Sequence, residues 1–169
     1  MCGRCFEIYG NEKGGRKMQK DVKIRKQERK QSMKKYLNIS LFYAVAALAA
    51  GVFYREFTKL NGYTGVCELG KVHPHLFILG MLVFLVVALF AAHNDLKKFK
   101  TFRAFLCIYN IGVPLSAVML AVRGVCRVLD LPLSSGATAA ISGIAGIGHI
   151  LAGAGIILLI LALRKTAKN

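Results

Sequence analysis

Residues 138–163 read TAAISGIAGIGHILAGAGIILLILAL, a stretch without a single Asp, Glu, Lys or Arg. An apolar stretch of about 20 residues is long enough to cross the ~30 Å hydrocarbon core of a bilayer as an α-helix. Three further apolar runs precede it, over about residues 37–54, 72–93 and 102–122. Inside lipid every backbone polar group must pair within the protein, and four strands cannot close a barrel. The sequence therefore predicts an all-α bundle of four transmembrane helices.

The composition and the positions of the charged residues argue against a nucleic-acid-binding domain. The chain has 169 residues, 55% of them hydrophobic, and a formal net charge of +16. Twelve of its 24 Lys and Arg residues lie before Leu37, and the rest are spread thinly between apolar runs. A nucleic-acid-binding domain would keep such charge on one folded face. We expect no nucleic-acid partner, and instead a multi-pass protein of the plasma membrane with the lipid bilayer as its main partner.

The basic segment and the apolar segment predict two parts. Residues 1–36 form a basic cytoplasmic arm without an apolar stripe at helical spacing, and residues 37–169 form the four-helix membrane domain. Anionic lipid headgroups would attract the arm by ~1 kcal/mol per base near the surface. A second beginning stays open, because Met33 followed by two lysines and an apolar run is also a normal start of a membrane protein, in which case residues 1–32 are not translated.

The distribution of bases between the loops predicts the orientation. Basic residues concentrate on the cytoplasmic side of membrane proteins. Besides the arm, the bases gather in the second connection and in the C-terminal tail, as Lys97, Lys98, Lys100, Arg103, Arg164, Lys165 and Lys168. The other two connections contain fewer bases, which acidic residues partly offset. With four spans, all three basic segments fall on one side, so we expect both termini in the cytoplasm.

Several short motifs resemble a known family. They are FYREFTK at residues 53–59, NGYTG at 61–65, HPH at 73–75, LGM at 79–81 and SGIAGIGH at 142–149. Together they resemble an uncharacterised family of small four-helix integral membrane proteins from Gram-positive bacteria, a domain of unknown function. The resemblance covers about Met33 to the end of the chain. It implies the four-helix architecture and no activity.

His149 is the most informative polar residue within the apolar runs. Polar groups are costly inside a bilayer and usually face the bundle interior. Helical spacing places His149 in a stripe of small residues, formed by Ser142, Ala145, Gly146, Ala152 and Gly153. Either a neighbouring helix backbone or a flat ligand such as a porphyrin must fill the space beside it. We therefore treat His149 as a candidate ligand of haem iron or of another metal.

His75 and His73 are the candidate partners of His149. His149 lies about 21 Å from the inner end of its helix and His75 about 27 Å from the inner end of its own, close enough to meet when helices tilt by ~20°. Two imidazoles facing across a bundle hold a six-coordinate haem iron. Basic residues on the same outer side would suit haem propionates, namely Arg55, Lys59, Arg123 and Arg127. The hypothesis is a small haem b or metal protein in electron transfer or sensing.

Other functions remain open from the sequence. A histidine among small residues often only hydrogen-bonds across a helix interface. The chain could then be a non-enzymatic assembly subunit whose Ser142, Gly146 and Gly153 dock against a second copy or a membrane partner. A transporter is disfavoured, because the spans contain almost no charge. No catalytic motif is present, such as H-E-x-x-H or a phosphate loop, so we expect no enzyme activity.

Two cysteines fall on the predicted outer side. Cys67 lies in the first outer connection and Cys126 at the outer end of the third run. An oxidising exterior permits a disulfide between them, which would tie the loop to that helix. The sequence predicts this bond without giving the separation of the two Cα atoms.

Overall fold

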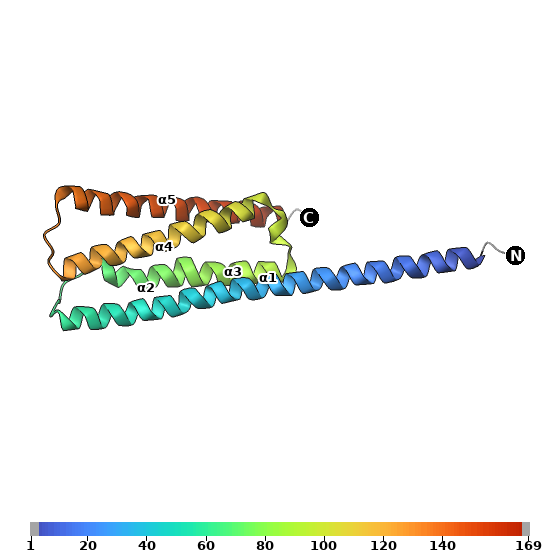
Figure 1. Ribbon diagram of the computed structural model, residues 1–169, viewed down its shortest axis with the longest axis horizontal. Helices are drawn as coiled ribbons and strands as arrows, with labels where there is room; N and C mark the ends of the chain where they lie inside the picture. Colours follow the sequence, from blue (N-terminus) through green and yellow to red (C-terminus); the bar gives the residue numbers. More distant parts are fainter. Residues whose placement is uncertain (1–3, 167–169) are drawn as a thin grey trace.

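The computed structural model describes the backbone of residues 4–166 and the side chains of residues 16–166. The described chain is all-helical (Figure 1). Its elements are α1 (Arg4–Leu60), η1 (Glu68–Lys71), α2 (Val72–His75), the π-helical η2 (Leu76–Leu82), α3 (Val83–His93), η3 (Leu96–Lys98), α4 (Lys100–Val128) and α5 (Ser135–Thr166). Four stretches of the described residues are long and apolar enough to cross a membrane: α1, the run Glu68–His93, α4 and α5. The predicted fold class is confirmed.

Helix α1 extends far beyond the predicted first span. It continues from the bundle into the basic arm as a single helix of 57 residues, which at 1.5 Å per residue is about 86 Å long. Between Arg16 and Tyr36 the chain contains no Pro or Gly and many Lys, Arg, Gln and Glu residues, which are good helix formers. The arm therefore needs no apolar stripe to be helical, and it projects past the other three spans (Figure 1).

The four spans pack in sequence order as two pairs. Helix α1 packs against α3 and η2, and α4 packs against α5 along its length. The two pairs meet where α4 contacts η1, α2 and η2. We call the end of the bundle that contains Tyr36, η3 and Arg164 the terminal end, because the arm leaves the bundle there and α5 ends there (Figure 1). The opposite end, with residues 61–67 and 129–134, is the loop end.

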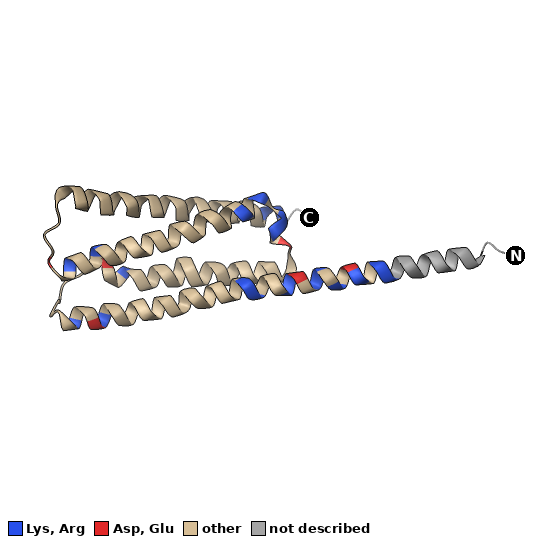
Figure 2. Cartoon of the chain, in the orientation of Figure 1, with Lys and Arg blue, Asp and Glu red and all other residues tan. Residues whose placement is uncertain are grey.

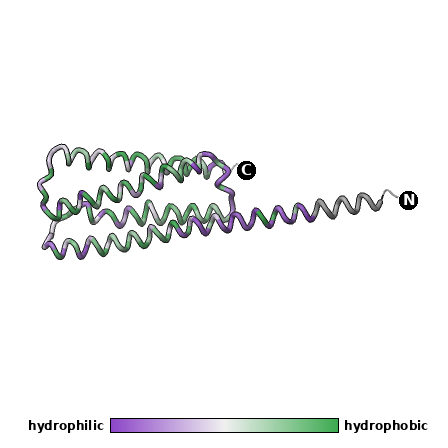
Figure 3. Tube along the Cα trace, in the orientation of Figure 1, coloured by the Kyte–Doolittle hydropathy of each residue, from purple (hydrophilic) through white to green (hydrophobic). Residues whose placement is uncertain are grey.

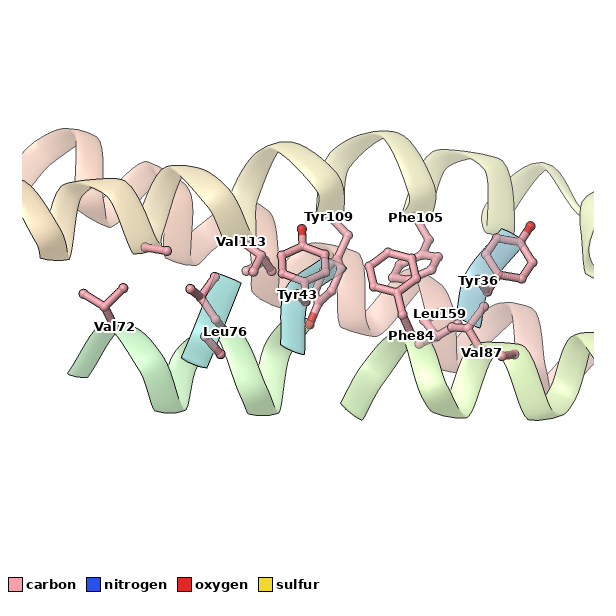
Figure 4. Close-up of a cluster of buried hydrophobic side chains, with 14 of the residues drawn as sticks. Tyr36, Tyr43, Val72, Leu76, Phe84, Val87, Phe105, Tyr109, Val113 and Leu159 are labelled. Carbon is pink, nitrogen blue, oxygen red and sulfur yellow. The ribbon is translucent and has the colours of Figure 1, made fainter. Parts of the chain in front are cut away.

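Aromatic side chains fill the centre of the bundle (Figure 4). Tyr43 stacks on Phe84 with ring centroids 5.8 Å apart, and Phe105 lies 5.1 Å from Tyr109. Nearer the terminal end, Tyr36 meets Phe102 edge-on at 5.7 Å. All of these rings are buried. Such contacts stabilise a pair by about 0.5–1.5 kcal/mol beyond burial alone, so this column of rings connects the two helix pairs.

The residues of the bundle are mostly hydrophobic along the whole length of its helices (Figure 3), and its outer surface is also apolar. Large hydrophobic side chains are exposed on every span, among them Leu41, Phe42, Leu89, Val118, Ile150 and Ile157. A water-soluble bundle would present polar residues on that face. Lys and Arg residues cluster instead along the arm and at the two ends of the bundle (Figure 2). This distribution is that of a multi-pass membrane protein.

Candidate functional site

The structure brings His75 and His149 together in the half of the bundle towards the loop end. The centroids of their imidazole rings lie 6.0 Å apart, and the ring planes are nearly perpendicular, at 84°. His75 is the last residue of α2, and His149 lies within α5. His75 is partly buried, whereas His149 is exposed at the bundle surface. The pair therefore lies at the seam between the second and fourth spans and opens towards the surrounding lipid.

Hydrogen bonds fix the protonation pattern of both rings. The Nδ1 atom of His75 lies 2.8 Å from the carbonyl oxygen of Lys71, and the Nδ1 atom of His149 lies 2.8 Å from that of Ala145. A carbonyl oxygen can only accept, so each Nδ1 donates its proton. In the neutral imidazole this leaves the lone pair on Nε2. Both rings are thus held in the tautomer that serves as a ligand through Nε2.

His73 and His93 lie elsewhere. His73 faces α1, since its Cβ and Cγ atoms are 3.7 Å from the position a Cβ would take on Gly51. Its Nδ1 atom is buried without a hydrogen-bond partner. Residues two apart on a helix point in nearly opposite directions, which separates His73 from His75. His93 ends α3 at the terminal end of the bundle. Of the two candidate partners, only His75 lies beside His149.

Only part of the small-residue stripe around His149 packs inside the bundle. The sequence left open whether a neighbouring helix, a flat ligand or a second copy fills the space beside this stripe. Of its members, Ala152 is buried, together with Gly148, Gly155, Leu159 and Ala162 of α5. Nothing lies within 4 Å of a Cβ placed on Gly146 or Gly153. Gly148 and Gly155 allow α4 to approach α5 closely on that face. The space beside Gly146 and Gly153, about one turn to either side of His149, therefore stays open.

The π-helical η2 follows His75 directly, and no motif in the sequence predicts it. Two of its carbonyl groups accept hydrogen bonds from neighbouring helices: the Tyr109 hydroxyl donates to Leu79 at 2.8 Å, and the Ser40 hydroxyl donates to Met81 at 2.9 Å. Gly80 lies against the ring of Tyr43, where a Cβ would overlap that ring. π-Helical turns occur often at functional sites. The helical spacing of Ser40, Tyr43 and Tyr109 can be read from the sequence. Which groups of η2 they contact is shown only by the packing of the helices.

Two of the basic residues at the loop end, Arg123 and Arg127, form ion pairs with one acid. Glu68 Oε1 lies 3.0 Å from Arg127 Nη2 and 3.8 Å from Arg123 Nε. The Glu68 side chain is only 14% exposed, so this ion pair is well shielded on its acidic side. Arg123 also donates to Ser142 Oγ at 3.3 Å. A ligand carboxylate at the histidine pair would have to compete with Glu68 for these guanidinium groups.

The ligand count limits which metal centre the pair can hold. Within the described part of the chain, no group of three or more His, Cys, Asp and Glu side chains is arranged to bind a metal. A structural zinc site uses four protein ligands and a catalytic one three. Haem brings four nitrogen atoms of its own and needs only axial ligands from the protein. Two imidazoles are therefore sufficient for haem and insufficient for an ordinary zinc site.

Three cysteines lie in the part of the chain whose side chains the structure describes, and each is a free thiol. Cys67 is buried beside η1, Cys126 is partly buried near the end of α4, and Cys107 is exposed on α4. The disulfide between Cys67 and Cys126 stays a prediction.

Comparison with known proteins identifies the chain only at the level of a family. No curated protein matches it, and no solved structure does. Residues 33–166 match the family described as protein of unknown function (DUF2871). The match begins at Met33, so residues 1–32 of the basic arm lie outside it. Since it covers the whole four-span bundle, the chain belongs to the DUF2871 family of unknown function.

Proposed function

We propose that His75 and His149 are the axial ligands of a haem, which would make the protein a small membrane electron-transfer or sensing component. The observation that carries the proposal is the 6.0 Å separation of two rings whose Nδ1 atoms are both committed to backbone carbonyls. His75 and His149 would supply the two nitrogen ligands that a haem takes from the protein, and the haem would supply the redox chemistry.

The surroundings of His149 leave room for a flat group. Gly146 and Gly153 lie about one helical turn to either side of it, and both are bare. The neighbouring surface is apolar, which suits a porphyrin and a low-dielectric iron site. With both axial positions taken by the chain, the iron would have no open coordination position. Electron transfer or redox sensing fits such a site better than bond-making on a substrate.

An absorption spectrum tests the proposal. The full chain, expressed with added haem precursor and purified in detergent, should show a Soret band and a bis-imidazole low-spin spectrum. His149→Ala and His75→Ala should each abolish the low-spin signature, while His93→Ala, at the opposite end of the bundle, should leave it unchanged. A colourless protein, or a band that survives both substitutions, would refute the axial pair.

A second candidate function is assembly with another membrane protein or with a second copy. It is supported by Gly146 and Gly153, beside which no neighbour lies within 4 Å. Ser142, the third residue of the predicted docking stripe, is exposed and accepts a hydrogen bond from Arg123. Small residues allow helices to approach closely in membranes. Gly146→Leu distinguishes the two functions: it should break a crosslinked complex if the stripe is an interface, and should weaken the haem spectrum if the stripe borders the porphyrin.

The same proposal includes the orientation and the location of the protein. We infer that the terminal end is cytoplasmic in the plasma membrane and that the arm lies near anionic headgroups, because most of the basic residues gather there. A fluorescent-protein fusion at the C-terminus should then be bright, and an alkaline phosphatase fusion there should be inactive. The reverse result would invert the topology.

A further inference from the structure

A groove with a volume of 690 Å³ lies between α1 and α4 in the terminal half of the bundle. Volumes of about 300–1,000 Å³ are typical of small-molecule sites. One stripe of α1, with members three or four residues apart, forms one wall: Gln31, Lys34, Lys35, Asn38, Ile39, Phe42 and Tyr43. Asn110 and Pro114 of α4 form the other wall. The groove exists because α1 packs against α3 and η2 while α4 packs against α5.

The groove changes character along its length. Lys34 and Lys35 line it towards the terminal end, and Ile39, Phe42 and Pro114 line its deeper part. From Lys34 to Phe42 the helix rises about 12 Å, roughly the distance from the headgroup region into the acyl chains of one leaflet. Phe42 is 70% exposed, so the described chain leaves this member of the apolar part uncovered.

The two lysines provide positive charge without a competing acid. Neither Lys34 nor Lys35 forms an ion pair with any side chain that the structure describes. Their aliphatic stems can lie along the helix while the ammonium groups stay at the headgroup level. A soluble anion would gain from the charges alone, whereas a phospholipid would also cover the apolar wall.

We propose that the groove between α1 and α4 binds one anionic phospholipid, with its phosphate at Lys34 and Lys35 and an acyl chain along Ile39, Phe42 and Pro114. The site is independent of the histidine pair, which lies towards the loop end. It also differs from a general attraction of the arm to a charged membrane surface, because the bound lipid would insert between two helices of the bundle.

Tryptophan fluorescence can test the proposal, because the chain contains no tryptophan of its own. Phe42→Trp places a single fluorophore in the groove, and Ile160→Trp places one on the lipid-facing side of α5, where Ile160 is exposed. Each full-length variant is reconstituted into vesicles that mix phosphatidylcholine and phosphatidylglycerol, with bromine on the acyl chains of only one lipid. Brominated phosphatidylglycerol should quench the Phe42→Trp variant preferentially, and both lipids should quench the Ile160→Trp variant equally.

Double charge variants then test whether the preference for phosphatidylglycerol depends on the two lysines of the groove. At about 1 kcal/mol per base near the headgroups, removing two bases should lower the preference about 30-fold at most. On the Phe42→Trp background, Lys34→Gln with Lys35→Gln should remove it, and arginine at both positions should retain it. Lys97→Gln with Lys100→Gln removes the same charge from the same end outside the groove, and should retain the preference.

Three results would overturn the proposal. Equal quenching of the Phe42→Trp variant by the two lipids would mean that the groove does not select anionic lipid. An equal loss in both double variants would mean that only the overall charge of the terminal end matters. Displacement of the brominated lipid by inorganic phosphate at constant ionic strength would identify a phosphate site rather than a phospholipid site.

Discussion

Replacing Gly112 with Ala tests the close contact between α4 and α5. A Cβ at this position would lie 2.6 Å from the amide nitrogen of Ala152 and 2.9 Å from the carbonyl carbon of Leu151. Both atoms belong to the backbone of α5, so no change of rotamer relieves the overlap. Ordinary contact begins at 3.4 Å. The helices must therefore separate locally by 3.4 minus 2.6, or about 0.8 Å.

The separation sets the size of the effect. A gap of 0.5–1 Å forfeits about a quarter to a half of each van der Waals contact across it, and overpacking a filled core costs about 1–3 kcal/mol. Packing is the main attraction between helices in lipid, so we take the upper value of about 3 kcal/mol. The higher helix propensity of alanine returns about 1 kcal/mol. The free energy of unfolding should fall by about 2 kcal/mol.

The assay is unfolding of the full chain by sodium dodecyl sulfate in mixed micelles, followed by far-ultraviolet circular dichroism. Gly146→Ala is the matched control, because it makes the same chemical change where nothing lies within 4 Å. It should leave the unfolding free energy unchanged or raise it by up to about 1 kcal/mol. If the two variants unfold at the same detergent fraction, α4 and α5 do not approach as closely as described.

Three further predictions concern other contacts. Tyr109→Phe removes the hydrogen bond to Leu79 in η2 and should lower the unfolding free energy by about 1 kcal/mol in the same assay. Glu68→Gln weakens the ion pair with Arg127, whose side chain is 46% exposed. The unfolding free energy should fall by less than about 1 kcal/mol, and by less again in high salt. A larger fall would mean that water reaches the pair less than its exposure indicates. Deleting residues 1–32 removes no fully buried side chain of the described chain, so insertion should persist and the unfolding free energy should change by less than about 0.5 kcal/mol.

The number and type of the spans were predictable because lipid leaves the backbone few choices. The charge-free run 138–163 can only be a helix in a bilayer, and it lies within α5. The length of α1 was not predictable from hydropathy, since a helix that leaves the membrane needs no apolar residues to continue. Its helicity comes from the intrinsic propensity of Lys, Arg, Gln and Glu, a signal that counting apolar residues ignores.

The candidate site was predictable in part. Helix rise placed His75 and His149 at similar depths, and their rings lie 6.0 Å apart. The interface of α5 was not predictable, because Gly146 and Gly148 look alike in the sequence and only the position of α4 decides which one is buried. The η2 segment was invisible for a similar reason: its carbonyls are satisfied by Ser40 and Tyr109, which come from other spans.

The η2 segment also separates the angular settings of the two halves of the second span. A π-helix spends one residue more than an α-helix over the same stretch, and one residue corresponds to about 100° of rotation. Deleting a lipid-facing member such as Ile78 would convert the segment to α-helix and keep Phe84 in the aromatic core. The half that carries His75 would then turn by about a quarter of a circle, away from His149. The extra residue of η2 thus determines whether the two imidazoles meet, whereas the packing of the second span on the terminal side of η2 does not depend on it.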